Sequence, residues 1–138
     1  MARREEAVID ASAAVKWFSG EEGVLEALKM RDEHVAGKLV LSAPDLFIYE
    51  MANALRFKPG FNDEKVGRAI SNIFDLQLDL IAPSGELVKR SQELAFTYDI
   101  TVYDSCYLAL AELMGISLYT SDKRFFEKAK ESGLIHFL

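Results

Sequence analysis

The stretch AVIDASAAVKWF (residues 7–18) determines how the fold begins. A short apolar run is followed by one aspartate, Asp10, and then by the small residues ASAA at 11–14. An apolar run of this kind is typical of a buried strand, and small residues allow a helix to begin close beside its end. We therefore expect Asp10 to lie where the first strand ends and a helix begins.

Strand-like and helix-like segments alternate along the rest of the chain. The predicted strands are residues 7–10, 38–44, 78–83, 116–122 and 134–138. The predicted helices are residues 23–38, 45–57, 64–76, 85–98, 104–115 and 122–133. Asn62 or Asp63 is placed to cap the third of these helices, and Ser84 the fourth. The alternation predicts a three-layer α/β/α sandwich with a central parallel sheet of about five strands. We expect a single domain over residues 1–138.

The composition excludes several classes of protein. Half of the 138 residues are hydrophobic, so the chain can bury a globular core. No apolar stretch reaches the length of a membrane span, and the N-terminus turns acidic before a signal peptide could develop, so we expect a cytoplasmic protein without membrane association. One cysteine and two histidines exclude an internal disulfide and a Cys/His zinc cluster. Any metal would have to be bound by carboxylates.

Four acidic residues lie at or near the predicted carboxyl ends of strands. They are Asp10, Glu50, Asp104 and Asp122. The carboxyl ends of parallel strands meet at one edge of the sheet, where open α/β folds bind ligands. Each aspartate precedes a helical pattern and could simply be an N-cap. Capping does not explain Glu50, because an acid within an apolar helical segment needs a partner.

Acids gathered at one edge predict a bound cation. Carboxylates packed together repel one another unless a cation compensates them. Mg²⁺ and Mn²⁺ prefer oxygen ligands, and they activate phosphodiester bonds and water for hydrolysis. The net charge of -6 is not an argument against a nucleic-acid substrate: without four site acids, 22 - 4 = 18 acids face 16 bases, a net charge of -2.

Polar and basic residues close to these acids are further candidates. The accessory polar residues are Ser12, Asn53, Thr120 and Ser121. Each also has a structural explanation, such as bonding to the local backbone or exposure to solvent. Basic residues on helices are usually solvated, but three could contact substrate phosphates: Arg56, Lys123 and Arg124.

These motifs resemble the PIN-domain family, and within it the compact VapC-like ribonuclease toxins of prokaryotic toxin–antitoxin pairs. The resemblance covers nearly the whole chain, and its segments are VIDASAAVKWF, APDLFIYEMANAL, YDSCYLALA and LYTSDKRF. It implies that Mg²⁺ or Mn²⁺ is bound by the four acids, with the four accessory residues around them.

The resemblance also implies an activity and partners. The activity is endonucleolytic cleavage of RNA that leaves a 5′-phosphate and a 3′-hydroxyl. The implied partners are a second copy of the chain and a small antitoxin that covers the active-site crevice. The apolar helix around LFIYEMANALRF (residues 46–57) could supply the surface for the antitoxin.

Three other interpretations remain open. A non-cleaving PIN-like scaffold would bind RNA or protein, although it has no need for four mutually repelling acids. A phosphatase of the haloacid dehalogenase type also begins with an aspartate after the first strand, but it requires a second acid where this chain has Ser12. A phosphoacceptor receiver domain requires adjacent acids after the first strand and a lysine after the last, and neither is found here.

Overall fold

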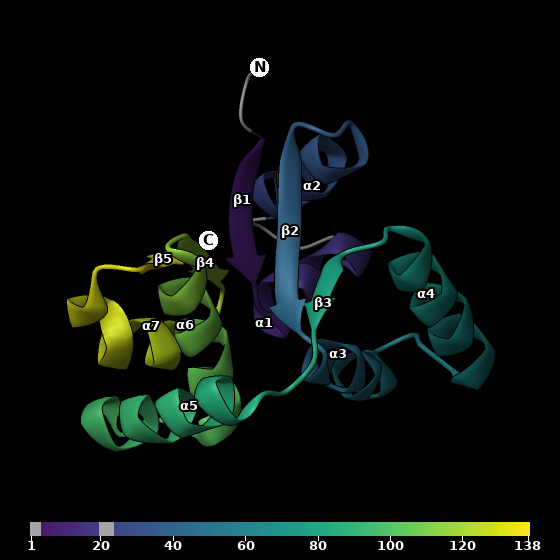
Figure 1. Cartoon of the computed structure of the whole chain (residues 1–138). Helices are drawn as coiled ribbons and strands as arrows, with labels where there is room; N and C mark the ends of the chain where they lie inside the picture. The colour runs from purple at the N-terminus through teal and green to yellow at the C-terminus, as the bar shows by residue number, and fades with distance from the viewer. Residues whose placement is uncertain (1–3, 20–23) are drawn as a thin grey trace.

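A computed structural model describes residues 4–19 and 24–138 of the chain. The described residues form a five-stranded sheet in the order β3-β2-β1-β4-β5, with every neighbouring pair parallel (Figure 1). The strands are β1 (Glu5–Ile9), β2 (Leu39–Pro44), β3 (Asp79–Ile81), β4 (Ser117–Thr120) and β5 (Ile135–Phe137). The predicted α/β/α architecture with a parallel sheet of about five strands is confirmed. β1 begins two residues earlier than predicted.

Helices cover both faces of this sheet. They are α1 (Ala11–Ala14), η1 (Val15–Phe18), α2 (Val24–Val35), α3 (Leu46–Arg56), α4 (Asp63–Asp75), α5 (Gly85–Tyr98), α6 (Val102–Met114), α7 (Lys123–Ala129) and η2 (Lys130–Ser132). α6 packs on β1, β2 and β4 with α5 against its outer side, while α2 packs on β2 from the opposite face (Figure 1). Gly23, the predicted start of the helix over residues 23–38, lies outside the described residues. No helix in the described part of the chain is both long and apolar enough to cross a membrane.

Side chains determine where several helices begin. Of the two predicted candidates, Asn62 caps α4 by accepting a hydrogen bond from the Lys65 amide at 2.8 Å, and Asp63 is the first residue of the helix. Ser84 caps α5 in the same way, as predicted. The predicted start of a helix at Asp104 is wrong, because α6 begins at Val102. The hydroxyl of Thr101 accepts the Asp104 amide at 3.0 Å and so caps α6. The Asp104 carboxylate is therefore not the cap of its own helix.

α6 is the central helix of the core. Its residues Ser105 to Ala111 are all buried, because the sheet covers one side of the helix and α5 the other. A helix that is buried all round must be apolar all round, and the sequence of α6 fits this requirement. The hydroxyl of Ser105 donates to the Ser91 carbonyl of α5 at 2.6 Å. The first turn of α6 is thereby held in a fixed position beside the strand ends.

His34 joins α2 to two other elements. Its Nδ1 accepts the amide of Leu41 in β2 at 3.0 Å. Because Nδ1 is the acceptor, the proton of the neutral ring is on Nε2, which donates to the Leu76 carbonyl after α4 at 2.7 Å. One imidazole therefore satisfies two backbone groups in different parts of the fold.

We predict that His34→Ala lowers the free energy of unfolding by roughly 1 to 3 kcal/mol, because the Leu41 amide and the Leu76 carbonyl lose their partner. Urea unfolding followed by circular dichroism measures the change. His136→Ala is the control: this exposed ring contacts the Ser117 hydroxyl and the Tyr119 ring, and we expect its loss to cost less than about 1 kcal/mol. Equal losses in the two variants would contradict the role assigned to His34.

Candidate functional site

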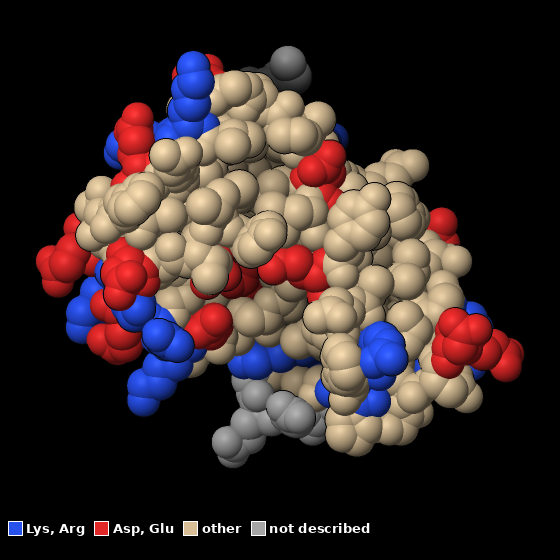
Figure 2. Space-filling view, turned by 90° about the horizontal axis from the view of Figure 1, so that it is seen from below, with Lys and Arg blue, Asp and Glu red and all other residues tan. Residues whose placement is uncertain are grey.

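The predicted acids lie at the carboxyl edge of the sheet. Asp10 directly follows β1, Asp122 lies two residues after β4, and α3 carries Glu50 beyond the end of β2. Asp104 is in the first turn of α6, which packs across the same three strands. Figure 2 views the molecule from this edge and shows acidic side chains gathered in a central hollow between surfaces formed mostly by other residue types.

The carboxylate of Asp10 is buried and held by three donors. Its Oδ1 accepts the Ser12 hydroxyl at 2.7 Å and the Ala13 amide at 3.1 Å, and its Oδ2 accepts the Thr120 hydroxyl at 2.5 Å. These bonds favour the ionised form, but burial outweighs them and raises the pKa of Asp10 to about 6. The charge of Asp104 acts in the same direction.

The hydroxyls of Ser12 and Thr120 connect the ends of β1 and β4. They lie 3.1 Å apart, and each also accepts a backbone amide of the segment after β4. The Ser121 amide donates to Ser12 at 2.9 Å, and the Asp122 amide donates to Thr120 at 3.0 Å. Two of the predicted accessory residues are thus placed in direct contact with Asp10.

The other two accessory residues lie differently. The Ser121 hydroxyl is directed toward the Leu138 carbonyl, at 3.4 Å, and not toward the acids. Asn53 is exposed on α3 and lines a separate hollow between α3 and α4. Within the described residues no hydrogen bond joins Asn53 to Glu50. The expectation that Asn53 orients Glu50 therefore stays a prediction.

Tyr107 is the partner of Glu50, and the sequence analysis missed it. Its hydroxyl donates to Glu50 Oε1 at 2.6 Å, and the residue is only 1% exposed. Burial and the charge of Glu50 raise the pKa of Tyr107, so the phenol keeps its proton and remains a donor. Burial also raises the pKa of Glu50, which the Tyr107 bond opposes. A signal was available: a tyrosine three residues after Asp104, within an apolar helix, needs an acceptor when buried.

Asp104 couples the four acids electrostatically. Burial raises its pKa to about 6, with further contributions from the charges of Asp122 and Glu50, while the hydrogen bond with Thr101 lowers it. Asp10 in turn is affected by the charge of Asp104. All four predicted acids therefore belong to one electrostatic group, although they come from separate segments of the chain.

Helix capping explains part of this arrangement. Asp10 caps α1, and Asp122 caps α7 by accepting the Phe125 amide at 3.1 Å. Asp104 does not cap its helix, and Glu50 lies within α3. Capping is thus compatible with a second role for two of the acids, and it does not account for the other two.

The donor set suits a hard divalent cation. The four side chains offer only carboxylate oxygens, which Mg²⁺ and Mn²⁺ prefer. Burial, with a smaller contribution from repulsion among the acids, raises the pKa of Asp10 and of Asp104 to about 6, and a bound cation would favour their charged forms. As they stand, no three Asp, Glu, His or Cys side chains within residues 4–19 and 24–138 are grouped closely enough to hold an ion. Cation binding would therefore have to draw the carboxylates together.

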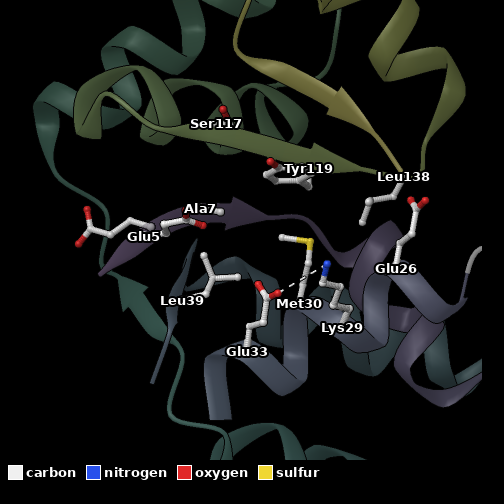
Figure 3. Close-up of a pocket in the computed structure, with 11 residues that line it drawn as sticks. Glu5, Ala7, Glu26, Lys29, Met30, Glu33, Leu39, Ser117, Tyr119 and Leu138 are labelled. Atoms are coloured by element: carbon white, nitrogen blue, oxygen red, sulfur yellow. Dashed lines mark ion pairs between the residues drawn. The ribbon is translucent and has the colours of Figure 1, made fainter. Parts of the chain in front are cut away.

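A different cavity lies on the α2 side of the sheet and is set apart from this site. It has a volume of about 620 Å³, and side chains of α2 face β1 and β4 across it (Figure 3). Its wall includes Glu5, Glu26 and Glu33, and the lysine among them, Lys29, is paired with Glu33 at 3.9 Å. None of the predicted site residues lines it. Its acidic wall disfavours an anionic ligand.

We predict that Asp10→Asn stabilises the protein in EDTA at about pH 7.5 by roughly 1 to 3 kcal/mol. The pKa of Asp10 rises from 3.8 to about 6 on folding, so the native state binds this proton more tightly. The stability of the wild-type protein should therefore fall as the pH rises from about 4 to 6. The asparagine should remove the part of this dependence that Asp10 contributes, while the raised pKa of Asp104 leaves the rest. Urea unfolding at several pH values measures it.

Asp45→Asn is the matched control for this substitution. Asp45 is exposed at the start of α3 and makes no side-chain capping bond, so we expect a change within about 0.5 kcal/mol. Destabilisation by Asp10→Asn at about pH 7.5 would contradict the unfavourable burial of this charge.

The comparisons with known proteins agree with the fold and with the motifs. A sequence model of the PIN domain matches residues 7–131. The chain is 31% identical to Ribonuclease VapC3 of Pyrobaculum aerophilum over 125 aligned residues. The alignment covers 88% of this chain and 92% of that protein.

Two solved structures show the same fold at low sequence identity. The first is VapC20 of Mycobacterium tuberculosis, a sarcin-ricin loop cleaving toxin, with a TM-score of 0.70, 17% identity, and coverage of 93% of this chain and 95% of that one. The second is VapBC2 of Rickettsia felis bound to a promoter DNA fragment, with a TM-score of 0.65, 13% identity, and coverage of 96% and 98%. The family match, the curated relative and the shared fold lead to one conclusion: this chain belongs to the PIN-domain family.

Proposed function

We propose that this protein is an endoribonuclease that depends on Mg²⁺ or Mn²⁺ and is the toxin of a VapBC-type pair. The observation that carries the proposal is the coupling of Asp10, Glu50, Asp104 and Asp122 into one acidic group at the carboxyl edge of the sheet. The similarity to a protein named Ribonuclease VapC3 and to a VapBC structure supports it. We propose that residues 1–138 act as one PIN-like domain in the cytoplasm.

The proposed reaction assigns a task to each group of residues. The four acids would hold the divalent ion, which supplies Lewis-acid activation of the phosphodiester and of water. Ser12 and Thr120 keep the Asp10 carboxylate oriented, and Tyr107 does so for Glu50. Hydrolysis forms a bond between the oxygen of water and phosphorus and breaks the bond from phosphorus to O3′. The products are a 5′-phosphate and a 3′-hydroxyl.

Protein partners are also part of the proposal. Two large aromatic side chains are exposed here, Tyr49 of α3 (79% exposed) and Phe57 at its C-cap (69% exposed). A hollow of about 660 Å³ separates α3 from α4. Exposed apolar surface of this kind is typical of protein interfaces. It supports docking of a small antitoxin on α3, and we further propose that the protein forms a homodimer.

We predict that Asp104→Asn lowers the rate of RNA cleavage at least about 100-fold, because the neutral amide removes one anionic ligand from the proposed metal site. EDTA should abolish cleavage, and excess Mg²⁺ or Mn²⁺ should restore it. Gel electrophoresis of a 5′-labelled RNA pool of random sequence measures the rate, and the termini of the products test the proposed end chemistry.

Asp75→Asn provides the control, because Asp75 is an exposed acid at the end of α4, remote from the strand ends. It should retain the wild-type rate. Full cleavage in EDTA, or by Asp104→Asn, would overturn the proposed mechanism. RNA binding without cleavage at any divalent concentration would favour the non-cleaving scaffold instead.

We predict that Tyr107→Phe raises the Mg²⁺ concentration needed for half-maximal cleavage by about 10-fold. The substitution keeps the buried ring but removes the donor that holds Glu50. Isothermal titration with Mn²⁺ reports the same change without relying on activity. Tyr49→Phe removes an exposed hydroxyl from the residue next to Glu50 and should leave both measurements unchanged. An unchanged metal requirement in Tyr107→Phe would exclude this positioning role.

A further inference from the structure

A cavity of about 420 Å³ adjoins the acidic site on its α7 side. Asp104 and Asp122 form part of its wall, so it is continuous with the proposed metal site. Across from them, α7 contributes Arg124 and Lys128, and the segment between α5 and α6 contributes Ile100. Its volume is within the range of about 300 to 1,000 Å³ that is typical of ligand pockets. The cavity therefore combines acids, bases and an apolar surface beside the proposed reaction centre.

The two bases in this cavity differ in their contacts. Lys128 Nζ donates to the Asp99 carbonyl at 2.8 Å and lies 3.4 Å from its carboxylate, so this side chain is held against the wall. Arg124 is exposed and forms no ion pair or hydrogen bond with any described residue. The two are four residues apart, on the same side of α7. Arg124 is thus the base whose donors are available to a ligand.

The structure separates Arg124 from the other candidate bases. Lys123 is exposed on the same helix but does not line the cavity. Arg56 stacks on the Phe57 ring at 4.5 Å and lines the hollow between α3 and α4 instead. Position alone therefore selects Arg124 from the three bases that the sequence offered as phosphate contacts.

We infer that this cavity binds an RNA backbone phosphate next to the scissile one, with Arg124 as the principal contact. The inference rests on the proposed function. A guanidinium presents several donors in a planar arrangement that matches two phosphate oxygens. Ile100 provides apolar surface for the attached sugar, and Lys128 adds positive charge beneath the phosphate.

The charges around the cavity predict that the divalent ion strengthens this contact. Asp99, Asp104 and Asp122 contribute three negative charges and the two bases contribute two positive charges, which leaves -1. With Asp10 and Glu50, the other two proposed ligands of the ion, the sum is -3, and a divalent cation changes it to -3 + 2 = -1. The ion therefore weakens the repulsion of an anion. Because the Arg124 guanidinium is positively charged and unpaired among the described residues, it favours an anionic phosphate over a cationic side chain of a protein partner.

The test compares Arg124→Ala with Lys123→Ala. Both variants lose one positive charge from an exposed position on α7, and neither should change the melting temperature. With Mg²⁺ and a random-sequence RNA pool, we expect Arg124→Ala to raise the apparent KM about 3- to 10-fold and to change kcat less than about 2-fold. The slope of log kcat/KM against log salt should fall by about one. Lys123→Ala should match the wild type, and Arg124→Lys should recover part of the loss.

The outcomes separate this inference from the proposed function. If the wild type cleaves RNA but Arg124→Ala keeps its KM, or if Lys123→Ala shows an equal loss, the cavity assignment is overturned and the nuclease stands. If the wild type does not cleave, the proposed function fails. Fluorescence anisotropy with the same RNA pool and Mg²⁺ then tests whether the cavity binds RNA. Weaker RNA binding by Arg124→Ala, but not by Lys123→Ala, supports the cavity assignment. If Arg124→Ala binds RNA as tightly as the wild type, or loses binding to a protein partner instead, the assignment is overturned.

Discussion

The burial of an ionisable carboxylate at the end of the central strand is the constraint on which the rest of the site depends. Asp10 is removed from water, and two hydroxyls and one amide replace the lost hydration. These bonds only partly offset the cost of burial, so its pKa remains raised to about 6. The donors come from the segment after β1 and from β4, so the same contacts that hold the carboxylate also join two neighbouring strand ends.

α6 provides the second half of the site because one face of its first two turns approaches the strand ends. Asp104 lies on this helix one turn before Tyr107, and Tyr107 reaches Glu50 on α3. The buried surroundings of α6 hold both residues in place while raising the pKa of each ionisable group. The packing that builds the core thus also sets the electrostatics of the site. Thr101 makes this possible, because its hydroxyl caps the helix in place of the Asp104 carboxylate.

The distribution of charge matters more here than the total charge. The chain has a net charge of -6, yet the two cavities beside the sheet have different characters. The one on the α2 side has a glutamate-rich wall whose lysine is already paired (Figure 3). The one beside α7 places two bases next to two acids of the site. A divalent cation would offset two of the negative charges around the second cavity, so overall acidity does not argue against an anionic substrate.

The sequence by itself determined the parallel α/β order, the placement of four acids at or near the strand ends, and the cap at Ser84, and it narrowed the cap of α4 to Asn62 or Asp63. These follow from hydrophobic periodicity and from bonds between near neighbours in the chain, which a local pattern records. Only the tertiary structure decided that Tyr107 holds Glu50, which is 57 residues away in the sequence. It also decided that the Ser121 hydroxyl points away from the acids and that Arg124 lines a cavity. Those contacts depend on the strand order and on the rotation of each packed helix, and no short stretch of sequence contains that information.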